Sequence, residues 1–266
     1  MTKSSIPTND IIRKAVEIVD EAKQIGGIIR IIGGLAILIH SLEYENLFYR
    51  LDRLGLGDRQ ITDIDFITYR SSIKFIDQVL QKLGYKLDYR VALFYGDSRR
   101  IYYSNDGTYQ VDIFIERLNY NHLIEFSTPG CKRLELDYPT ITPSDLLLEK
   151  LQIHKIAEKD IKDIILLLRA HELKMDDYRD AIDLKRLEDT LGKDWGFWYE
   201  TKLNLKKVLF FTKKYVREKI IDEESAQNVD GKVSMLLKFL DEMPKTSEWI
   251  KRANIGDKKK WWKEIE

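Results

Sequence analysis

The segment Thr62–Ile67 contains two carboxylates, Asp63 and Asp65, within a run of apolar and β-branched residues. Such a run predicts a β-strand, in which successive side chains point to opposite faces. Asp63 and Asp65 are therefore expected on one face, opposite the apolar side chains of the run. Two carboxylates at this spacing repel each other, and a divalent cation with oxygen ligands is their usual positive partner. Taken alone, the pair is explained more simply by an edge strand whose polar face contacts water.

A pair of glycines joins an earlier apolar strand to a helix. The β-branched run Ile28–Ile32 predicts a buried strand, Gly33 and Gly34 follow at once, and a helix is expected over Leu35–Ser41. Glycines at such a junction let a ligand approach the backbone, and the amides at the start of a helix favour an anion. The pair alone is more typical of a tight strand-to-helix turn that binds nothing.

A third carboxylate, Asp112, falls in the middle of an alternating strand expected over Thr108–Glu116. The strand follows a hairpin turn predicted at residues 105–107, and Asp112 is on its less apolar face. The segment is apolar enough to be central in a sheet, where an unpartnered carboxylate is costly. Asp112 is therefore expected either to be hydrogen-bonded within the protein or to serve as a third metal ligand.

Apolar periodicity and capping residues predict the other elements. The expected helices start at a capping Asn9 or Asp10 (to Gln24), at Ser71 or Ser72 (to Leu83), at Ser144, and over residues 159–170. The expected strands cover residues 85–95 and 99–103, a hairpin covers residues 129–139, and residues 44–60 form a long loop or insertion. After Met175 the pattern predicts only helices. The fold class is therefore α+β, with a mixed sheet flanked by helices in residues 1–140 and a helical bundle in residues 141–266.

The overall charge excludes a general attraction to nucleic acid or membrane, because Lys plus Arg and Asp plus Glu each number 44. A nucleic-acid role then requires a local basic patch. One is predicted on the helix around residues 202–220, where four cations fall in one stripe: Lys202, Lys206, Lys213 and Arg217. A solvated face balanced by acids on neighbouring helices explains this stripe equally well.

The last residues, Lys258–Lys263, place two tryptophans among lysines. Such a segment can stack nucleic-acid bases. Docking of the C-terminus on the helical bundle is the simpler interpretation.

Cysteine use and hydropathy predict a cytoplasmic protein without a membrane partner. The single Cys131 excludes an internal disulfide and fits a reducing compartment. The most apolar window, Ile25–Ile39, contains Arg30 and four glycines and is too short to span a bilayer. The first ten residues lack the pattern of a signal peptide.

The order of these motifs resembles the nucleotidyltransferase superfamily that includes polymerase-beta-like enzymes. Its motif is an apolar strand, Gly-Gly or Gly-Ser, a helix, an Asp-x-Asp and a distant third Asp. Two later segments, Leu147–Leu151 and Lys159–Leu168, look like the Leu-x-x-Lys-Leu and Lys-Asp-x-x-Asp-Leu patterns of the AbiEii-type toxins. The resemblance covers residues 28–169, and the spacing from Gly34 to Asp63 is longer than the family pattern.

The resemblance implies an N-terminal nucleotidyltransferase domain that transfers a nucleoside monophosphate from an NTP to a hydroxyl group of a macromolecule. Asp63 and Asp65 would hold two Mg²⁺ ions, and Asp112 would bind the ion that activates the acceptor hydroxyl. The amides of Gly33 and Gly34 would cradle the triphosphate.

The resemblance also implies roles for the later motifs. Lys150 would lie near the phosphates as a point charge. Lys159, Asp160 and Asp163 would shape the nucleotide site or hold Lys150, although acids in a first helical turn are also favoured by the helix dipole alone. Arg59 is a weaker candidate for a phosphate contact.

Three functions remain open on these residues. The first is transfer to RNA such as tRNA, which the basic stripe favours, with an antitoxin protein as a further partner if the chain is a toxin. The second is an adenylyltransferase of a small molecule such as an antibiotic, which would need an acidic cleft for a cationic drug. The third is a non-catalytic nucleotide-binding module, against which the presence of all three aspartates argues.

Overall fold

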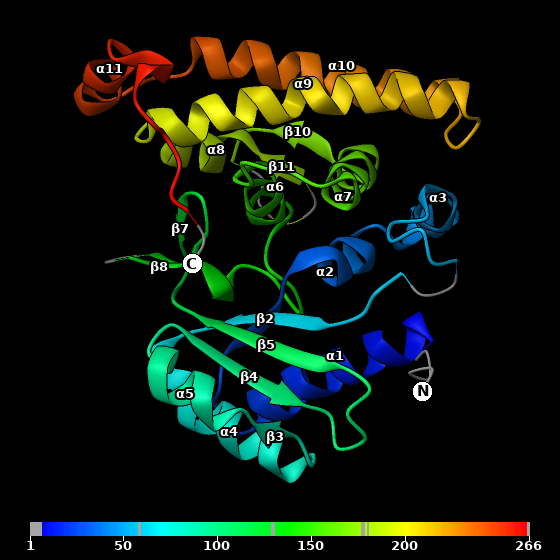
Figure 1. Ribbon diagram of the computed structural model, residues 1–266, viewed down its shortest axis with the longest axis vertical. Coiled ribbons are helices and arrows are strands. Elements are labelled where there is room, and N and C mark those ends of the chain that lie inside the picture. Colours follow the sequence, from blue (N-terminus) through cyan, green and yellow to red (C-terminus); the bar gives the residue numbers. More distant parts are fainter. Residues whose placement is uncertain (1–6, 58–59, 129–130, 177–178, 180, 265–266) are drawn as a thin grey trace. The chain divides into compact units, whose positions relative to one another are not determined.

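The computed structural model describes residues 7–57, 60–128, 131–176, 179 and 181–264 (Figure 1). These residues form a mixed α+β fold with a small mixed sheet and a helical C-terminal region, as the sequence predicts. Internal contacts divide the chain into two compact units. Unit 1 comprises Met1–Ile39, Leu54–Leu118 and Glu125–Ile141, and unit 2 comprises His40–Arg53, Asn119–Ile124 and Thr142–Glu266. The sequence placed one boundary after residue 140 and did not anticipate the two shorter segments of unit 2.

The sheet of unit 1 has five strands in the order β1-β2-β5-β4-β3. The strands are β1 (Ile29–Ile31), β2 (Ile64–Thr68), β3 (Lys86–Leu87), β4 (Arg99–Tyr103) and β5 (Gln110–Ile115). Strands β2 and β5 are parallel, and the other neighbouring strands are antiparallel. The strand that carries Asp112 is therefore central, which confirms the expectation from its apolar sequence.

Helices of unit 1 cover the apolar faces of this sheet. They are α1 (Thr8–Gln24), α2 (Gly33–His40, of which the last residue belongs to unit 2), α4 (Ile73–Lys82) and α5 (Tyr89–Tyr95), with the 3₁₀ turns η2 (Arg70–Ser72) and η3 (Arg133–Glu135). Helix α1 contacts β1 and α4. Figure 1 shows α1 and α4 along the same side of the sheet. The core contains apolar side chains of β1, which the sequence predicted as a buried strand, and of β2 and β5, whose alternation it predicted.

The predicted strand over residues 85–95 is wrong in its second half. Only Lys86–Leu87 pairs in the sheet, and the helix α5 follows. The Asp88 side chain begins this helix by accepting hydrogen bonds from the backbone N–H groups of Arg90 and Val91. The aromatic residues of this segment suggested a strand, but the capping carboxylate directs the chain into a helix.

Two predicted helix starts and one predicted side-chain cap require correction, although Ser72 does stand at the N-cap position of α4. Helix α1 begins at Thr8, after Pro7, rather than at Asn9 or Asp10. Ser72 precedes α4, but its hydroxyl accepts a hydrogen bond from Ile28 N at 3.0 Å. Ser144 lies within α6 (Pro143–Leu151), because Thr142 caps that helix. The hydroxyls of both serines bind backbone N–H groups distant in the chain, which local sequence does not reveal.

Unit 2 consists mainly of helices. They are α3 (Glu45–Leu51), α6, α7 (Glu158–Ala170), α8 (Leu184–Leu191), α9 (Trp195–Arg217), α10 (Glu223–Glu242) and α11 (Ser247–Ala253), with the 3₁₀ turns η1 (Leu42–Tyr44) and η4 (Gly256–Lys258). A parallel pair of strands, β10 (Glu172–Lys174) and β11 (Ala181–Asp183), corrects the prediction that only helices follow Met175. Strand β11 has three buried residues, too few for a detectable period.

Short strands complete the described chain. The chain passes from unit 1 to unit 2 within β6 (Arg117–Asn119) and returns within β7 (Leu123–Glu125). Strands β8 (Ser127–Thr128) and β9 (Cys131–Lys132) pair antiparallel, so the pairing begins earlier than the hairpin predicted at residues 129–139. Residues 129 and 130 of that prediction lie outside the described residues. In the part of the chain that the structure describes, no helix combines the length and apolar character needed to cross a bilayer.

Candidate active site

Asp65 and Asp112 lie directly opposite each other on the two parallel strands of the sheet. Asp65 of β2 is in register with Asp112 of β5. Neighbouring strands lie roughly 4.8 Å apart, and residues in register point to the same face. The fold therefore brings together two predicted metal ligands that are distant in the sequence.

The two carboxylates occupy the face of the sheet away from α4. Tyr102 is in register with Val111 of β5, and its hydroxyl donates a hydrogen bond to Asp77 of α4. Because side chains alternate along β5, Asp112 points away from α4. Asp112 is nevertheless buried, and Asp65 is half-buried.

Asp63 lies one residue before β2 and is exposed. Its carboxylate accepts a hydrogen bond from the Thr62 hydroxyl at 2.9 Å. Asp63 therefore lies at the solvent-exposed N-terminal end of β2, two residues before Asp65.

The glycine pair lies beside the strand that carries Asp65. Gly33 begins α2 with a φ of 73°, a left-handed conformation that favours glycine. The preceding residue, Ile32, donates its backbone N–H to the carbonyl oxygen of Asp65 at 2.9 Å. The start of α2 is thereby fixed next to Asp65 within unit 1, as the predicted motif requires.

An arginine that sequence reasoning missed binds Asp112. Arg99 Nε donates to Oδ1 and Oδ2 of Asp112 at 2.8 and 3.1 Å, and Arg99 Nη2 donates to Oδ2 as well. The Asp112 side chain is 6% exposed and that of Arg99 is 44% exposed. Strand alternation could have indicated this partner once the register was known, because Arg99 lies two residues before Ile101, which is in register with Asp112. Period-two alternation therefore places Arg99 on the same face as Asp112.

This arrangement can be tested for its fit to a divalent cation. Asp65 and Asp112 supply hard carboxylate oxygens on one face, which is the donor type that Mg²⁺ prefers. The positive charge of the Arg99 guanidinium stabilises the buried carboxylate of Asp112. Within the described residues, however, no three His, Cys, Asp or Glu side chains converge as a preformed metal-binding group. Asp65 and Asp112 thus supply the donor type that a divalent cation needs, and Arg99 contacts both oxygens of Asp112 in this structure.

Lys150 lies at the centre of a buried ionic cluster in unit 2. We call Lys150, Glu149, Asp160, Asp163 and Arg53 the Lys150 cluster. Lys150 Nζ is 3.1 Å from Asp160 Oδ1, 3.0 Å from Asp163 Oδ2 and 4.0 Å from Glu149 Oε1. Burial alone would lower the pKa of Lys150, but the carboxylates of Asp163, Glu149 and Asp160 outweigh it and raise this pKa above its usual range. Lys150 is therefore held as a cation.

Arg53 completes the cluster and was also missed from the sequence. Its Nε donates to Asp163 Oδ1 at 2.7 Å. Burial would raise the pKa of Asp163, but Lys150 and Arg53 lower it below its usual range. Asp163 therefore remains a carboxylate although its side chain is only 2% exposed.

The remaining predicted residues divide into exposed, buried and undescribed groups. Lys159 is exposed on the first turn of α7, outside the Lys150 cluster. Gly34 is buried in the first turn of α2. Arg59 lies outside the described residues.

The basic stripe on α9 is only partly exposed. Lys206, Lys213 and Arg217 are exposed, whereas Lys202 pairs with Asp241 of α10 at 2.5 Å. Lys213 and Arg217 line a surface hollow of about 330 Å³ that also contains acidic residues of α10. The stripe therefore offers three exposed cations for a phosphate backbone.

The C-terminal tryptophans dock on unit 2, as the simpler interpretation of the sequence expected. The Trp262 ring stacks on His154 with a centroid distance of 3.7 Å. Trp261 Nε1 donates to Glu200 Oε2 at 2.8 Å. These contacts use the rings that base stacking would require.

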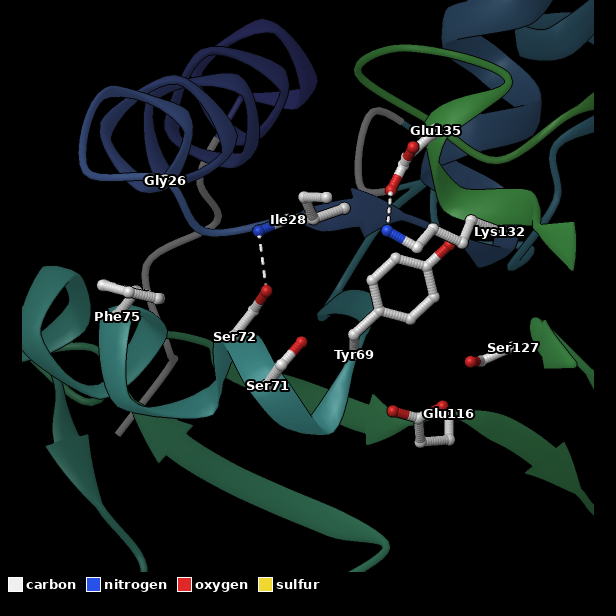
Figure 2. Close-up of a pocket in the computed structure, with 10 residues that line it drawn as sticks. All are labelled: Gly26, Ile28, Tyr69, Ser71, Ser72, Phe75, Glu116, Ser127, Lys132 and Glu135. Atoms are coloured by element: carbon white, nitrogen blue, oxygen red, sulfur yellow. Dashed lines mark hydrogen bonds and ion pairs between the residues drawn. The ribbon is translucent and has the colours of Figure 1, made fainter. Parts of the chain in front are cut away.

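A separate cavity of about 310 Å³ lies beyond the other end of β2, near Tyr69 and Ser71 (Figure 2). Figure 2 shows charged groups around it, but these pair within the protein: Lys132 with Glu135 at 3.5 Å, and Glu116 with the backbone N–H of Arg70 at 2.7 Å. The residues that line this cavity differ from the predicted site residues.

Comparisons of the chain with protein-family models, with curated proteins and with solved structures find no significant match. The resemblance to nucleotidyltransferases therefore rests on the sequence motifs alone.

Proposed function

We propose that this protein is a metal-dependent nucleotidyltransferase that moves a nucleoside monophosphate from an NTP to a hydroxyl group of an RNA such as tRNA. One observation carries the proposal: Asp65 and Asp112, predicted as ligands from separate motifs, are in register on adjacent parallel strands. A sheet without a functional site has little reason to place two carboxylates side by side near its centre, because their repulsion is destabilising.

Each part of the site in unit 1 then has a role. Asp65 and Asp112 hold the metal, with Asp63 at the open end of the strand as the further ligand. Bound Mg²⁺ would neutralise phosphate charge and increase the acidity of the acceptor hydroxyl. The first amides of α2, at Gly33 and Gly34, bind phosphate oxygens, because helix N-termini favour anions. The left-handed Gly33 lets the triphosphate approach the backbone without a clash with a Cβ atom.

Lys150 receives a positioning role in this proposal rather than a direct phosphate contact. Its ammonium group is buried and already lies within 3.1 Å of two carboxylates. A third carboxylate and Arg53 complete the cluster. Asp160 and Asp163 thus hold Lys150, which is one of the two roles that the resemblance implied for them, and the network joins α6 to α7.

The acceptor is proposed to be RNA because the exposed cations of α9 favour a polyanion. Lys206, Lys213 and Arg217 are spaced along one helix and can track a phosphate backbone. A cationic antibiotic would require an acidic surface instead.

One observation favours the alternative of a non-catalytic nucleotide-binding module. Arg99 already neutralises Asp112, so the carboxylate does not need a metal to be stable. In that case the protein would bind NTP with an affinity that is the same with and without Mg²⁺. Calorimetric titration of an NTP in both conditions distinguishes the two functions.

The test of catalysis is transfer of label from each α-labelled NTP to total tRNA in the presence of Mg²⁺. We expect label in RNA with the wild type and a loss of at least about 100-fold with Asp65→Asn, because two-metal chemistry depends on each carboxylate ligand. Asp97→Asn is the matched control, since Asp97 is an exposed carboxylate of the same unit that pairs with Arg70. Absence of label with every NTP, or equal labelling by wild type and Asp65→Asn, would refute the proposed function.

A further inference from the structure

Helix α5 of unit 1 carries an exposed apolar face. Tyr89, Leu93 and Phe94 are 80%, 78% and 76% exposed, and Tyr95 is 62% exposed. The helix contacts β4 (Figure 1), yet none of the seven residues that the structure describes in it is buried. Single exposed apolar residues are common on soluble proteins, whereas a contiguous group of large ones marks a binding surface.

Contacts at both ends of α5 hold this face in a defined shape. The Asp88 carboxylate, which caps the first turn, also accepts a hydrogen bond from the Tyr103 hydroxyl of β4 at 3.2 Å. After the last turn, the Ser98 hydroxyl donates to the carbonyl oxygen of Tyr95 at 3.1 Å. The apolar side chains are therefore presented by a fixed helix rather than by an irregular loop.

The composition of the face is that of a protein–protein interface. Residues four positions apart are neighbours on a helix, so Tyr89 lies beside Leu93, and Arg90 lies beside Phe94. The charged side chain among these four is that of Arg90, which is exposed. Aromatic residues and arginine are enriched in the centres of such interfaces, where lysine and the acidic residues are depleted.

Charges at the two ends of the face favour a second copy of this chain as its partner. Arg90 lies near the start of α5, whereas Asp97, with a side chain that is 94% exposed, follows its end. Two α5 helices packed antiparallel about a two-fold axis would bring Arg90 of each copy toward Asp97 of the other. A nucleic acid would instead meet one cation flanked by the carboxylates of Asp88 and Asp97, which repel phosphate. The formal net charge of the chain is zero, so two copies do not repel each other as wholes.

The area of the face also fits a dimer. Large side chains of this kind bury roughly 150–250 Å² each, so four of them at the exposures given above present on the order of 600 Å². Two copies would then bury about 1,200 Å² in total, which is the lower end of the range for specific interfaces. We expect such an interface to give a weak dimer, with a dissociation constant on the order of 10 µM.

We propose that the exposed face of α5 is a homodimer interface in which the α5 helices of two copies pack antiparallel. Leu93 and Phe94 form its centre, and Arg90 of each copy lies against Phe94 and Asp97 of the other. An arginine over an aromatic ring adds a cation–π contact to the apolar burial. The inference is independent of the proposed function, because α5 contains none of the candidate metal or phosphate ligands.

Sedimentation equilibrium of the full chain tests the interface. For the wild type we expect a monomer–dimer equilibrium, and for the double variant Leu93→Glu, Phe94→Glu a dissociation constant at least about 100-fold higher, because the central residues of an interface carry most of its binding energy. Phe210→Glu is the matched control, since Phe210 is an exposed ring of unit 2, on α9, and is 65% exposed. It should dimerise like the wild type. Circular dichroism should give all three proteins similar melting curves, because the substituted side chains are exposed.

A charge exchange tests the antiparallel arrangement. Arg90→Asp places like charges together at both ends of the interface and should weaken the dimer about tenfold. Adding Asp97→Arg to this variant restores opposite charges across the interface, so dimerisation should recover. A role of Arg90 in the folding of its own chain would not give this recovery.

Three results would overturn the inference. The first is a wild type that stays monomeric at concentrations well above the expected dissociation constant; if the Leu93→Glu, Phe94→Glu variant then also binds total tRNA more weakly, the face binds RNA instead. The second is a dimer that this double variant leaves intact, or that Phe210→Glu weakens equally. The third is a dimer that Arg90→Asp weakens and that Asp97→Arg fails to restore, which would refute the antiparallel pairing.

Discussion

Two ionic groups in this protein have opposite designs. In unit 1, one arginine meets one buried carboxylate, Asp112, at the margin of the sheet, and the arginine is nearly half exposed. In unit 2, the Lys150 cluster combines three carboxylates and two cations, and the Lys150 side chain is 6% exposed. A half-exposed pair can exchange one partner for a ligand, whereas a buried network loses several contacts at once if any member leaves.

The comparison assigns different tasks to the two groups. The Lys150 cluster joins α6 and α7, and the pKa shifts of Lys150 and Asp163 keep these two groups charged near neutral pH. The Arg99–Asp112 pair is the more exposed one, and it lies next to the second carboxylate, Asp65, and the glycine turn. The motifs singled out by the sequence thus contain both a structural ionic centre and the candidate active site.

The largest expected effect is the loss of the central cation of the Lys150 cluster. Lys150→Met leaves buried carboxylates without their shared partner and should lower the free energy of unfolding by about 3–5 kcal/mol. Urea denaturation measures the change. Lys159→Met is the matched control, because Lys159 is exposed nearby on α7, and it should change stability by less than about 0.5 kcal/mol. Equal effects of the two variants would contradict the structural role of the cluster.

The pH dependence of the same variant tests the charge states. Lys150 has a pKa raised above 10.5, so its contribution is complete below pH 10.5 and is lost as the pH rises through the higher folded-state pKa. Asp163 has a pKa lowered below 3.8, so its contribution is complete above pH 3.8 and is lost as the pH falls through the folded-state pKa. We therefore expect wild-type stability to receive a constant contribution from both groups between these limits. In Lys150→Met, Asp163 loses the cation that most lowers its pKa, so this variant should gain stability relative to the wild type as the pH falls. A stability difference that does not change with pH would contradict the assignment.

A smaller effect on stability is expected for the Arg99–Asp112 pair. Arg99→Gln leaves the carboxylate of Asp112 buried with a weaker partner and should lower the free energy of unfolding by about 1–3 kcal/mol. Because a metal would replace the missing charge, Mg²⁺ should raise the melting temperature of Arg99→Gln more than that of the wild type. Thermal denaturation with and without Mg²⁺ measures both changes. The same response to Mg²⁺ in Lys150→Met would remove the distinction between the two groups.

The smallest effect is expected for an exposed ion pair of unit 1. Arg70 Nη1 is 2.7 Å from Asp97, and their side chains are 55% and 94% exposed. Arg70→Gln should change the free energy of unfolding by less than about 1 kcal/mol, since solvent screens exposed pairs. Urea denaturation therefore should rank the three variants by exposure, and a different ranking would show that burial does not explain the comparison.

Local patterns in the sequence revealed the acidic residues but not their cationic partners. Alternation along residues 108–116 placed Asp112 in a central strand, and this was confirmed. Arg99 binds it because of the register between β4 and β5, which depends on the hairpin turn between them. Arg53 reaches Asp163 over 110 positions of sequence, from a segment interpreted as a loop or insertion. Its pairing is set by tertiary packing and has no local signal.

The failed predictions of secondary structure have the same physical origin. A capping carboxylate at Asp88 outweighed the strand propensity of the aromatic residues after it. The Ser72 hydroxyl accepts a hydrogen bond from the backbone N–H of Ile28, just before β1, and the Ser144 hydroxyl accepts one from Asp183 of β11. Neither hydroxyl caps its own helix. In each case, side-chain hydrogen bonds to backbone N–H groups accompany a structure that composition and periodicity did not predict.

The most direct test of the central comparison is nuclear magnetic resonance of the two cations during titration with Mg²⁺ and a non-hydrolysable NTP analogue. The Nε–H signal of Arg99 and the Nζ signal of Lys150 report the hydrogen bonds of each group. We predict that the Arg99 signal shifts as the metal binds Asp112, while the Lys150 signal is unchanged. An Arg99 signal that stays constant at saturating ligand concentrations would contradict the account.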